Sequence, residues 1–177
     1  MDLQEKTLSS KIAYQGKILN VRFDEVEVSS GHRSFREVVE HSGGVVIVAI
    51  KNDSILFVKQ FRYPLKQTLL ELPAGKLEVG ENPDIACKRE LEEETGYVAK
   101  NWTSLGYIFT SCGFCNEKLY LYLAQDMEFV GEHPDEGEVL VNYEYKISEV
   151  EDMILSGEIN DAKTICAIHR ALKKVGK

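Results

Sequence analysis

The spacing of charged residues in the segment 75–97 constrains this chain most. Gly75 is followed after five residues by Glu81, and after seven more by the run Arg-Glu-Leu-Glu-Glu-Glu-Thr-Gly, which begins at Arg89. Like charges packed this densely are unfavourable on one face of a helix unless a cation offsets them. The segment therefore indicates either a solvated acidic surface or a cation-binding site.

The same segment carries the start and stop signals of a single helix. Asn82 is a good N-cap, Pro83 suits the first helical position, and Gly96 suits the C-cap. We therefore predict a helix over 83–95.

The carboxylates of this predicted helix are placed to bind metal. Residues three and four apart on a helix are neighbours, so Glu90, Glu93 and Glu94 share one face. Carboxylate oxygens are ligands that Mg²⁺ prefers. Arg89 lies four residues before Glu93 and can brace it, while Glu81 can add or orient a ligand. A merely solvated acidic face is the alternative, but it leaves the fixed spacing of the glycines and the arginine unexplained.

Composition limits the class of protein. The chain has 177 residues, of which 44% are hydrophobic, and this suits one globular domain with a small appendage. Its net charge of −8 argues against a surface for nucleic acid or anionic membrane. The apolar run 45–50 is too short to cross a bilayer, and the first residues lack a signal-peptide pattern. We expect a cytoplasmic protein without nucleic-acid or membrane partners.

Cys112 and Cys115 have the spacing of a redox motif or of half a zinc site. No second pair completes a zinc site, and no thioredoxin-like context surrounds them. We expect reduced cysteines of a loop or the core.

Apolar and turn-forming residues predict an α+β protein in which helices pack on a largely mixed sheet. Two strands separated by Ser29-Ser30-Gly31 form a predicted hairpin in an N-terminal β unit, 1–40, which precedes the main domain, 41–177. A capping box at Ser148 and a start near Asp161 mark two further helices. The predicted strands are 18–28, 34–40, 45–50, 55–58, 68–72, 103–110, 118–124 and 139–145.

The segment 75–97 matches the Nudix box, so the chain resembles the Nudix hydrolases, which cut a diphosphate linked to a nucleoside with the help of divalent metal. The resemblance implies the Nudix fold, a mixed sheet between helices, here with a small N-terminal antiparallel β unit. Other marks make the chain similar to the ADP-ribose pyrophosphatase branch over nearly its whole length. These marks are Arg36-Glu37-Val-Val-Glu-His41, Gln60-Phe61-Arg62, Glu71-Leu-Pro-Ala74-Gly75, Ser111-Cys-Gly-Phe-Cys-Asn-Glu117, Asp135-Glu136-Gly-Glu138 and Asp161-Ala-Lys-Thr-Ile165.

The resemblance also implies metal ligands. By position, they are the backbone carbonyl of Ala74 and the side chains of Glu90 and Glu94, with Glu93 assisting metal binding and catalysis. Mg²⁺ is the implied ion, and Mn²⁺ is a possible substitute.

Catalytic and substrate residues follow from the same resemblance. Glu136 matches the general base of the branch, with Glu138 as the alternative, although acidic residues are ordinary in a polar loop. The positions that contact substrate are Arg36, Glu37 and Arg62, and Glu117 is a further candidate. The alternative for Arg36 and Glu37 is an ion pair with each other across a β edge, and the alternative for Arg62 is an ordinary charge at the end of a strand.

Members of this branch split ADP-ribose into AMP and ribose 5-phosphate, and they form homodimers whose N-terminal strands help to build the partner's site. Two positions depart from the pattern, because Cys112 and Ser42 stand where proline is common. Other substrates, namely GDP-mannose, another ADP-sugar or FAD, therefore stay open. A non-catalytic domain that senses ADP-ribose is a further alternative, although the box glutamates are all present.

Overall fold

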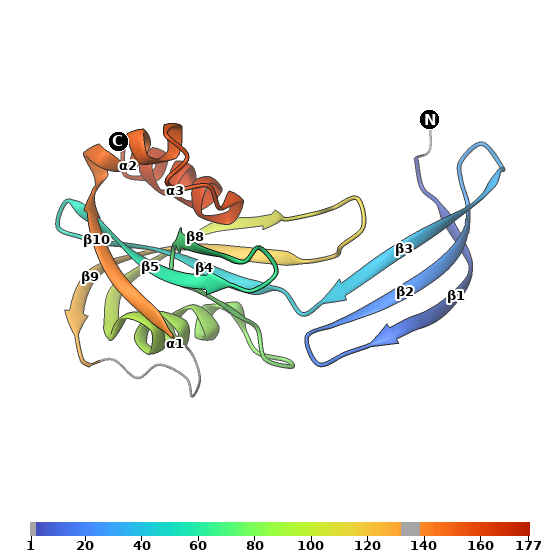
Figure 1. Ribbon diagram of the computed structural model, residues 1–177, viewed down its shortest axis with the longest axis horizontal. Coiled ribbons are helices and arrows are strands. Elements are labelled where there is room, and N and C mark those ends of the chain that lie inside the picture. The colour runs from blue at the N-terminus through green and yellow to red at the C-terminus, as the bar shows by residue number, and fades with distance from the viewer. Residues whose placement is uncertain (1–2, 132–138) are drawn as a thin grey trace. The chain divides into compact units, whose positions relative to one another are not determined.

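The computed structural model describes residues 3–131 and 139–177. The chain divides into two compact units (Figure 1). Unit 1 comprises Met1–Gly43 and Phe109–Lys118, and unit 2 comprises Gly44–Ile108 and Leu119–Lys177. No helix within the described ranges is long and apolar enough to span a membrane.

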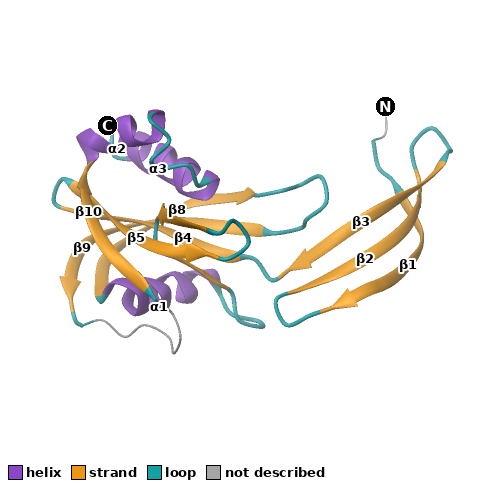
Figure 2. Ribbon diagram, viewed as in Figure 1, coloured by secondary structure: helices purple, strands orange, loops and turns teal. Residues whose placement is uncertain are grey.

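Unit 1 contains a three-stranded antiparallel sheet in the order β1-β2-β3 (Figure 2). The predicted hairpin is confirmed as β2 (Leu19–Glu27) paired with β3 (Arg33–His41). Its turn uses Gly31 at φ 82°, a conformation that glycine adopts without a steric penalty. The strand β1 (Lys6–Gln15) was not predicted, and every residue in it is exposed.

Unit 2 is built on a seven-stranded sheet with the main order β10-β5-β4-β9-β8, and the predicted mixed character of the sheet is confirmed. The central strand β4 pairs antiparallel with β5 and parallel with β9, while β6 pairs with β5 and β7 pairs with β4. The strand bounds are β4 Gly44–Lys51, β5 Ser54–Arg62, β6 Gln67–Glu71, β7 Ala74–Lys76, β8 Tyr97–Phe109, β9 Lys118–Phe129 and β10 Leu140–Lys146.

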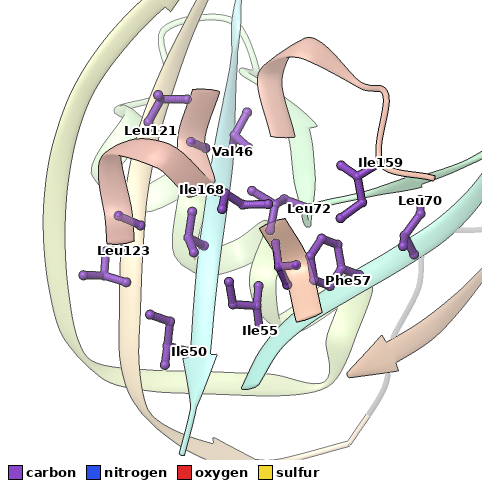
Figure 3. Close-up of a cluster of buried hydrophobic side chains, with 14 of the residues drawn as sticks. Val46, Ile50, Ile55, Phe57, Leu70, Leu72, Leu121, Leu123, Ile159 and Ile168 are labelled. Atoms are coloured by element: carbon purple, nitrogen blue, oxygen red, sulfur yellow. The ribbon is translucent and has the colours of Figure 1, made fainter. Parts of the chain in front are cut away.

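Helices cover both faces of this sheet, with α1 on one side and α2 and α3 on the other (Figure 1). A strand covered on both faces needs apolar residues throughout, which explains the unbroken apolar run of β4. Alternate residues of β4 join two clusters of buried side chains, one of which is drawn in Figure 3. Val46, Val48 and Ile50 pack with residues of α2 and α3, whereas Val45, Ile47 and Ala49 pack with residues of α1.

The helix α1 (Pro83–Thr95) has the predicted bounds and caps. Asn82 Oδ1 accepts a hydrogen bond from the backbone N–H of Asp84 at 2.9 Å, and Gly96 closes the helix at φ 70°. Leu91 anchors α1 to the sheet and is fully buried. Truncating such a side chain to alanine costs about 2–5 kcal/mol, so the helix is held firmly on the sheet.

The two C-terminal helices differ in how well their starts were predicted. The helix α3 (Ala162–Lys174) begins after Asp161, whose Oδ2 accepts from Thr164 N at 3.0 Å, as expected of an N-cap. The helix α2 (Ile147–Leu155) begins earlier than the predicted box at Ser148. Glu149 accepts from the backbone N–H of Lys146 at 3.1 Å, so the Ser148 box was wrong.

Candidate active site

The short strand β7 lies beside α1 and brings two predicted metal ligands together. Val46 of β4 is the register partner of Ala74 of β7. The backbone N–H of Ala74 donates to Glu94 Oε2 at 2.9 Å, and the side chain of Glu94 is almost fully buried. From β10, Asn142 Nδ2 donates to the backbone carbonyl of Glu94 at 3.1 Å. These contacts fix the last turn of α1 against the sheet.

Gly75 is required because Glu90 packs directly against its backbone. A Cβ atom added at Gly75 would lie only 1.8 Å from the carboxyl carbon of Glu90. Any larger residue would therefore displace this carboxylate. The spacing between the first glycine of the segment and the glutamates thus has a steric cause, and it brings Glu90 next to β7.

Arg89 holds three glutamates together. Its guanidinium donates to both carboxylate oxygens of Glu81 at 3.0 Å and lies 2.9 Å from Glu90 Oε1 and 2.8 Å from Glu93 Oε2. The hydrogen bonds with Glu81 raise the pKa of Arg89 and lower the pKa of Glu81. The predicted contact between Arg89 and Glu93 is confirmed, whereas the contacts with the other two glutamates were not foreseen.

The donor set of this region fits a hard divalent cation, because it consists of carboxylate and backbone oxygens. Across residues 3–131 and 139–177, no three His, Cys, Asp or Glu side chains are arranged as a metal-binding group. Mg²⁺ is commonly bound by one or two carboxylates together with waters and substrate phosphates. Glu90 and Glu94, held next to β7, suit that mode of binding.

Arg62, predicted to contact substrate, forms a fork-like ion pair with Glu71. The guanidinium Nε and Nη2 atoms donate to the two oxygens of Glu71, each at 2.7 Å. Glu71 is 1% exposed and also contacts Lys163. Burial alone would raise the pKa of Glu71, but the hydrogen bonds and charges of Arg62 and Lys163 outweigh burial and lower it. Glu71 and Lys163 lie in two of the motifs quoted for the family resemblance, but no local pattern indicated that they would pair.

Two further predicted substrate residues lie on β3 of unit 1. Arg36 pairs with Glu5, at 2.9 Å from Nε, and its Nη1 donates to the backbone carbonyl of Phe35 at 2.7 Å. Glu37 is exposed and is the register partner of Phe23 on β2. Within this unit, Arg36 thus forms an ion pair with Glu5 and not with Glu37.

Glu117 lies in unit 1, at the end of the loop that the prediction singled out. Its Oε2 accepts from Thr110 Oγ1 at 2.6 Å, and its Oε1 lies 3.3 Å from His41 Nδ1. The predicted general base Glu136 and its alternative Glu138 lie outside the described residues.

Comparison with known families agrees with this geometry. The family model described as the NUDIX domain matches residues 40–168, which is most of the chain. The chain belongs to the Nudix family of hydrolases. A second model, described as the nucleoside diphosphate sugar hydrolase N-terminal domain, matches residues 5–39. Nudix hydrolases generally use divalent metal ions, consistent with the oxygen donors beside β7.

Individual relatives align over almost the whole of this Nudix chain. An ADP-ribose pyrophosphatase of Bacillus subtilis is 40% identical over 169 residues, covering 94% of this chain and 91% of the relative. An ADP-ribose pyrophosphatase of Mycobacterium tuberculosis is 38% identical, covering 92% and 81%. The methanol dehydrogenase activator of Bacillus methanolicus is 38% identical, covering 93% and 91%.

A solved structure shares the fold. The crystal structure of an ADP compounds hydrolase superimposes with a TM-score of 0.88 at 24% sequence identity, covering 99% of this chain and 98% of that one. The predicted Nudix fold, with an antiparallel N-terminal β unit, is therefore confirmed.

Proposed function

We propose that the protein hydrolyses the diphosphate of ADP-ribose, giving AMP and ribose 5-phosphate, with Mg²⁺ as its metal ion and Mn²⁺ as a substitute. The observation that carries the proposal is the complete set of box carboxylates, with Glu90 and Glu94 held against β7. The substrate is supported by relatives named ADP-ribose pyrophosphatase, which are 38–40% identical over most of the chain.

In this proposal, Glu90, Glu94 and the carbonyl of Ala74 hold the metal, and Glu93 assists. Bound Mg²⁺ would neutralise the charge of the diphosphate and stabilise the charge that develops on the AMP leaving group. Water attacks one phosphorus while a carboxylate accepts its proton. Glu136 has the role of this base, and Glu138 is the alternative.

Arg89 orients the carboxylates of the box and does not accept the proton. Arg89 keeps Glu90 and Glu93 in place through contacts of 2.9 and 2.8 Å. Because an arginine guanidinium stays protonated in proteins, Arg89 cannot act as the base. Its contribution is to orient the carboxylates and to offset their mutual repulsion.

Substrate contacts are proposed for four residues that match the family motifs, one of them in unit 2. Arg62 offers a guanidinium whose orientation is fixed by Glu71, which suits a phosphate or a nucleotide base. The three in unit 1 are Arg36, Glu37 and Glu117.

A homodimer completes the proposal. Unit 1 exposes all of β1, and a strand edge of this kind readily pairs with another chain. Exposed apolar side chains on the same sheet would be covered in such an assembly. They are Leu8, Ile12, Tyr14, Phe23 and Phe35.

Sedimentation equilibrium should give twice the chain mass, and deletion of residues 1–40 should give a monomer with reduced turnover. A fully active monomeric deletion would overturn the role of the dimer.

The proposed activity is tested by comparing kcat/KM for ADP-ribose, GDP-mannose, FAD and a nucleoside triphosphate with Mg²⁺. We expect ADP-ribose to have the highest value. A higher value for another compound would retain the hydrolase but replace the substrate. Tight binding of ADP-ribose without cleavage of any compound would favour the sensing domain.

A second candidate function rests on the relative named methanol dehydrogenase activator. The alignment with it covers 93% of this chain, and we propose as the second candidate that this protein raises the activity of a partner dehydrogenase. Adding the protein to a methanol dehydrogenase and measuring the rate of methanol oxidation tests this directly. A rate increase that Glu94→Gln abolishes would support it, and an unchanged rate would reject it.

A further inference from the structure

We propose that Glu71 is a positioning residue for Arg62, and that Lys163 completes this arrangement from the start of α3. The inference rests on the proposed function, in which Arg62 contacts the substrate. This inference assigns a role to two motifs, Glu71-Leu-Pro and Asp161-Ala-Lys-Thr, that the proposed mechanism does not use.

Glu71 is a buried carboxylate whose oxygens are both paired. Its side chain is 1% exposed, and both carboxylate oxygens accept hydrogen bonds from Arg62 at 2.7 Å. A carboxylate is costly to bury unless it is paired and hydrogen-bonded. Because the fork joins two planar groups through two parallel bonds, it fixes the orientation of the guanidinium as well as its position.

Glu71 engages only part of the Arg62 guanidinium. The fork uses Nε and Nη2, so Nη1 is the nitrogen of the guanidinium that Glu71 does not engage. The side chain of Arg62 is 38% exposed. Glu71 therefore holds one edge of the guanidinium, and in this proposal Nη1 is the nitrogen that binds an anionic or polar group of a ligand.

The pair of Arg62 and Glu71 is connected to the start of α3. Lys163 contacts Glu71 and lies 2.9 Å from Asp161 Oδ2. Thr164 Oγ1 accepts from the backbone N–H of Leu72 at 3.0 Å, in a fully buried position. The start of α3 is thus fastened to two consecutive residues, Glu71 and Leu72.

The same segment leads directly to the carboxylate site. Two residues after Leu72, the N–H of Ala74 donates to Glu94. The charge of Glu94 also acts on Arg62, adding to the larger effect of Glu71 in raising the pKa of Arg62. A shift of the segment 71–74 would therefore displace both Arg62 and the proposed metal ligands.

The charges of the network distinguish positioning from simple attraction. Arg62 and Lys163 carry two positive charges, and Glu71 and Asp161 carry two negative charges, so the sum is zero. Replacing Glu71 with glutamine makes this sum +1. If Glu71 only tuned the local field, an anionic substrate would bind more tightly to Glu71→Gln. A positioning role predicts the opposite, because the loosened guanidinium must be ordered again on binding.

The experiment compares Glu71→Gln, Glu71→Asp and Lys163→Met with the wild type. Isothermal titration of ADP-ribose in the presence of a chelator gives Kd without turnover, and steady-state assays with Mg²⁺ give KM and kcat. We expect Glu71→Gln and Glu71→Asp to raise Kd and KM about tenfold, which corresponds to the loss of one charge-assisted hydrogen bond. We expect kcat to change less than KM, and Lys163→Met to shift Kd in the same direction by a smaller factor.

Glu71→Asp guards against misfolding of Glu71→Gln, because it keeps the charge and only withdraws the carboxylate by one methylene group. Glu144→Gln is the matched control, since it breaks an ion pair with Lys51 in the same sheet and should leave Kd and KM unchanged. In addition, Arg62→Lys combined with Glu71→Gln should bind no more weakly than Arg62→Lys alone.

Each outcome decides the proposal. Unchanged or tighter binding by a folded Glu71→Gln or Glu71→Asp would overturn it while leaving the proposed function intact. If the wild type prefers another diphosphate, the same comparison applies with that compound. If the wild type neither binds nor cleaves any of them, the proposed function and this inference both fail.

Discussion

Replacing Gly75 with alanine would test how closely β7 packs on α1. The added Cβ would lie 1.8 Å from the carboxyl carbon of Glu90 and 1.9 and 2.1 Å from its oxygens. Carbon atoms in contact are normally about 3.5–4 Å apart, so the carboxylate must move by more than about 1 Å. Misplacement on this scale costs about 10²-fold in rate, which corresponds to about 2.7 kcal/mol of transition-state stabilisation.

The assay is kcat/KM for ADP-ribose with Mg²⁺, measured for Gly75→Ala, Glu90→Ala and the double variant. We expect Gly75→Ala to lose about 10²-fold. The double variant should be no slower than Glu90→Ala alone, because the alanine acts only by displacing that carboxylate. Thermal unfolding should change little, since the overlap is with the end of a flexible side chain.

Gly44→Ala provides the contrast, because its added Cβ would lie 2.5 Å from the backbone oxygen of Gly75. A clash with backbone cannot be relieved by rotation of a side chain, so this variant should lose stability as well as activity. Wild-type kcat/KM in a folded Gly75→Ala would refute the reasoning. An equal loss on top of Glu90→Ala would show that the alanine acts by another route.

Three further predictions follow from the described contacts. Glu94→Gln should reduce turnover by at least about 10²-fold. Its circular dichroism spectrum should be unchanged, because the amide oxygen can keep the hydrogen bond to β7. Near-normal turnover at saturating Mg²⁺ would exclude Glu94 as a ligand. Burial alone would raise the pKa of Glu71, but its ion pairs lower it. The contribution of Glu71 to the free energy of unfolding should therefore be fully present above the unfolded pKa of about 4.3. It should be lost as the pH falls through the lower pKa of the folded protein. Glu71→Gln should flatten this part of the denaturation profile, and an identical pH dependence would contradict the ion pairs. Burial raises the pKa of the Cys87 thiol to about 12, so a thiol reagent at pH 8 should label the exposed Cys112 and Cys166 well before Cys87; equal rates for all three in the native protein would contradict this burial.

Local sequence signals predicted α1 and β4 well. The helix is bounded by Asn82 and Gly96, whose caps depend only on the residues next to them. The unbroken apolar run of β4 indicated a strand buried on both faces, and the structure shows helices covering both faces. For α1, the decisive interactions join residues that are close in sequence. For β4, the two buried faces follow from the alternation of side chains along a strand.

Interactions between distant residues could not be predicted in the same way. Glu71 and Lys163 are 92 positions apart, and only the packing of α3 against the sheet brings them together. The strand β1 escaped prediction because none of its residues is buried, so no buried face distinguishes it in the sequence. Arg89 was expected to contact Glu93, but its bonds to Glu81 depend on how the loop before α1 folds back.

The most direct test of the account is the chromatographic measurement of products from ADP-ribose, with Mg²⁺ and with a chelator. The account predicts AMP and ribose 5-phosphate in equal amounts with Mg²⁺, and neither product when the ion is removed. Undiminished cleavage in the chelator, or no cleavage with Mg²⁺, would contradict a metal-dependent diphosphate hydrolase built on Glu90 and Glu94.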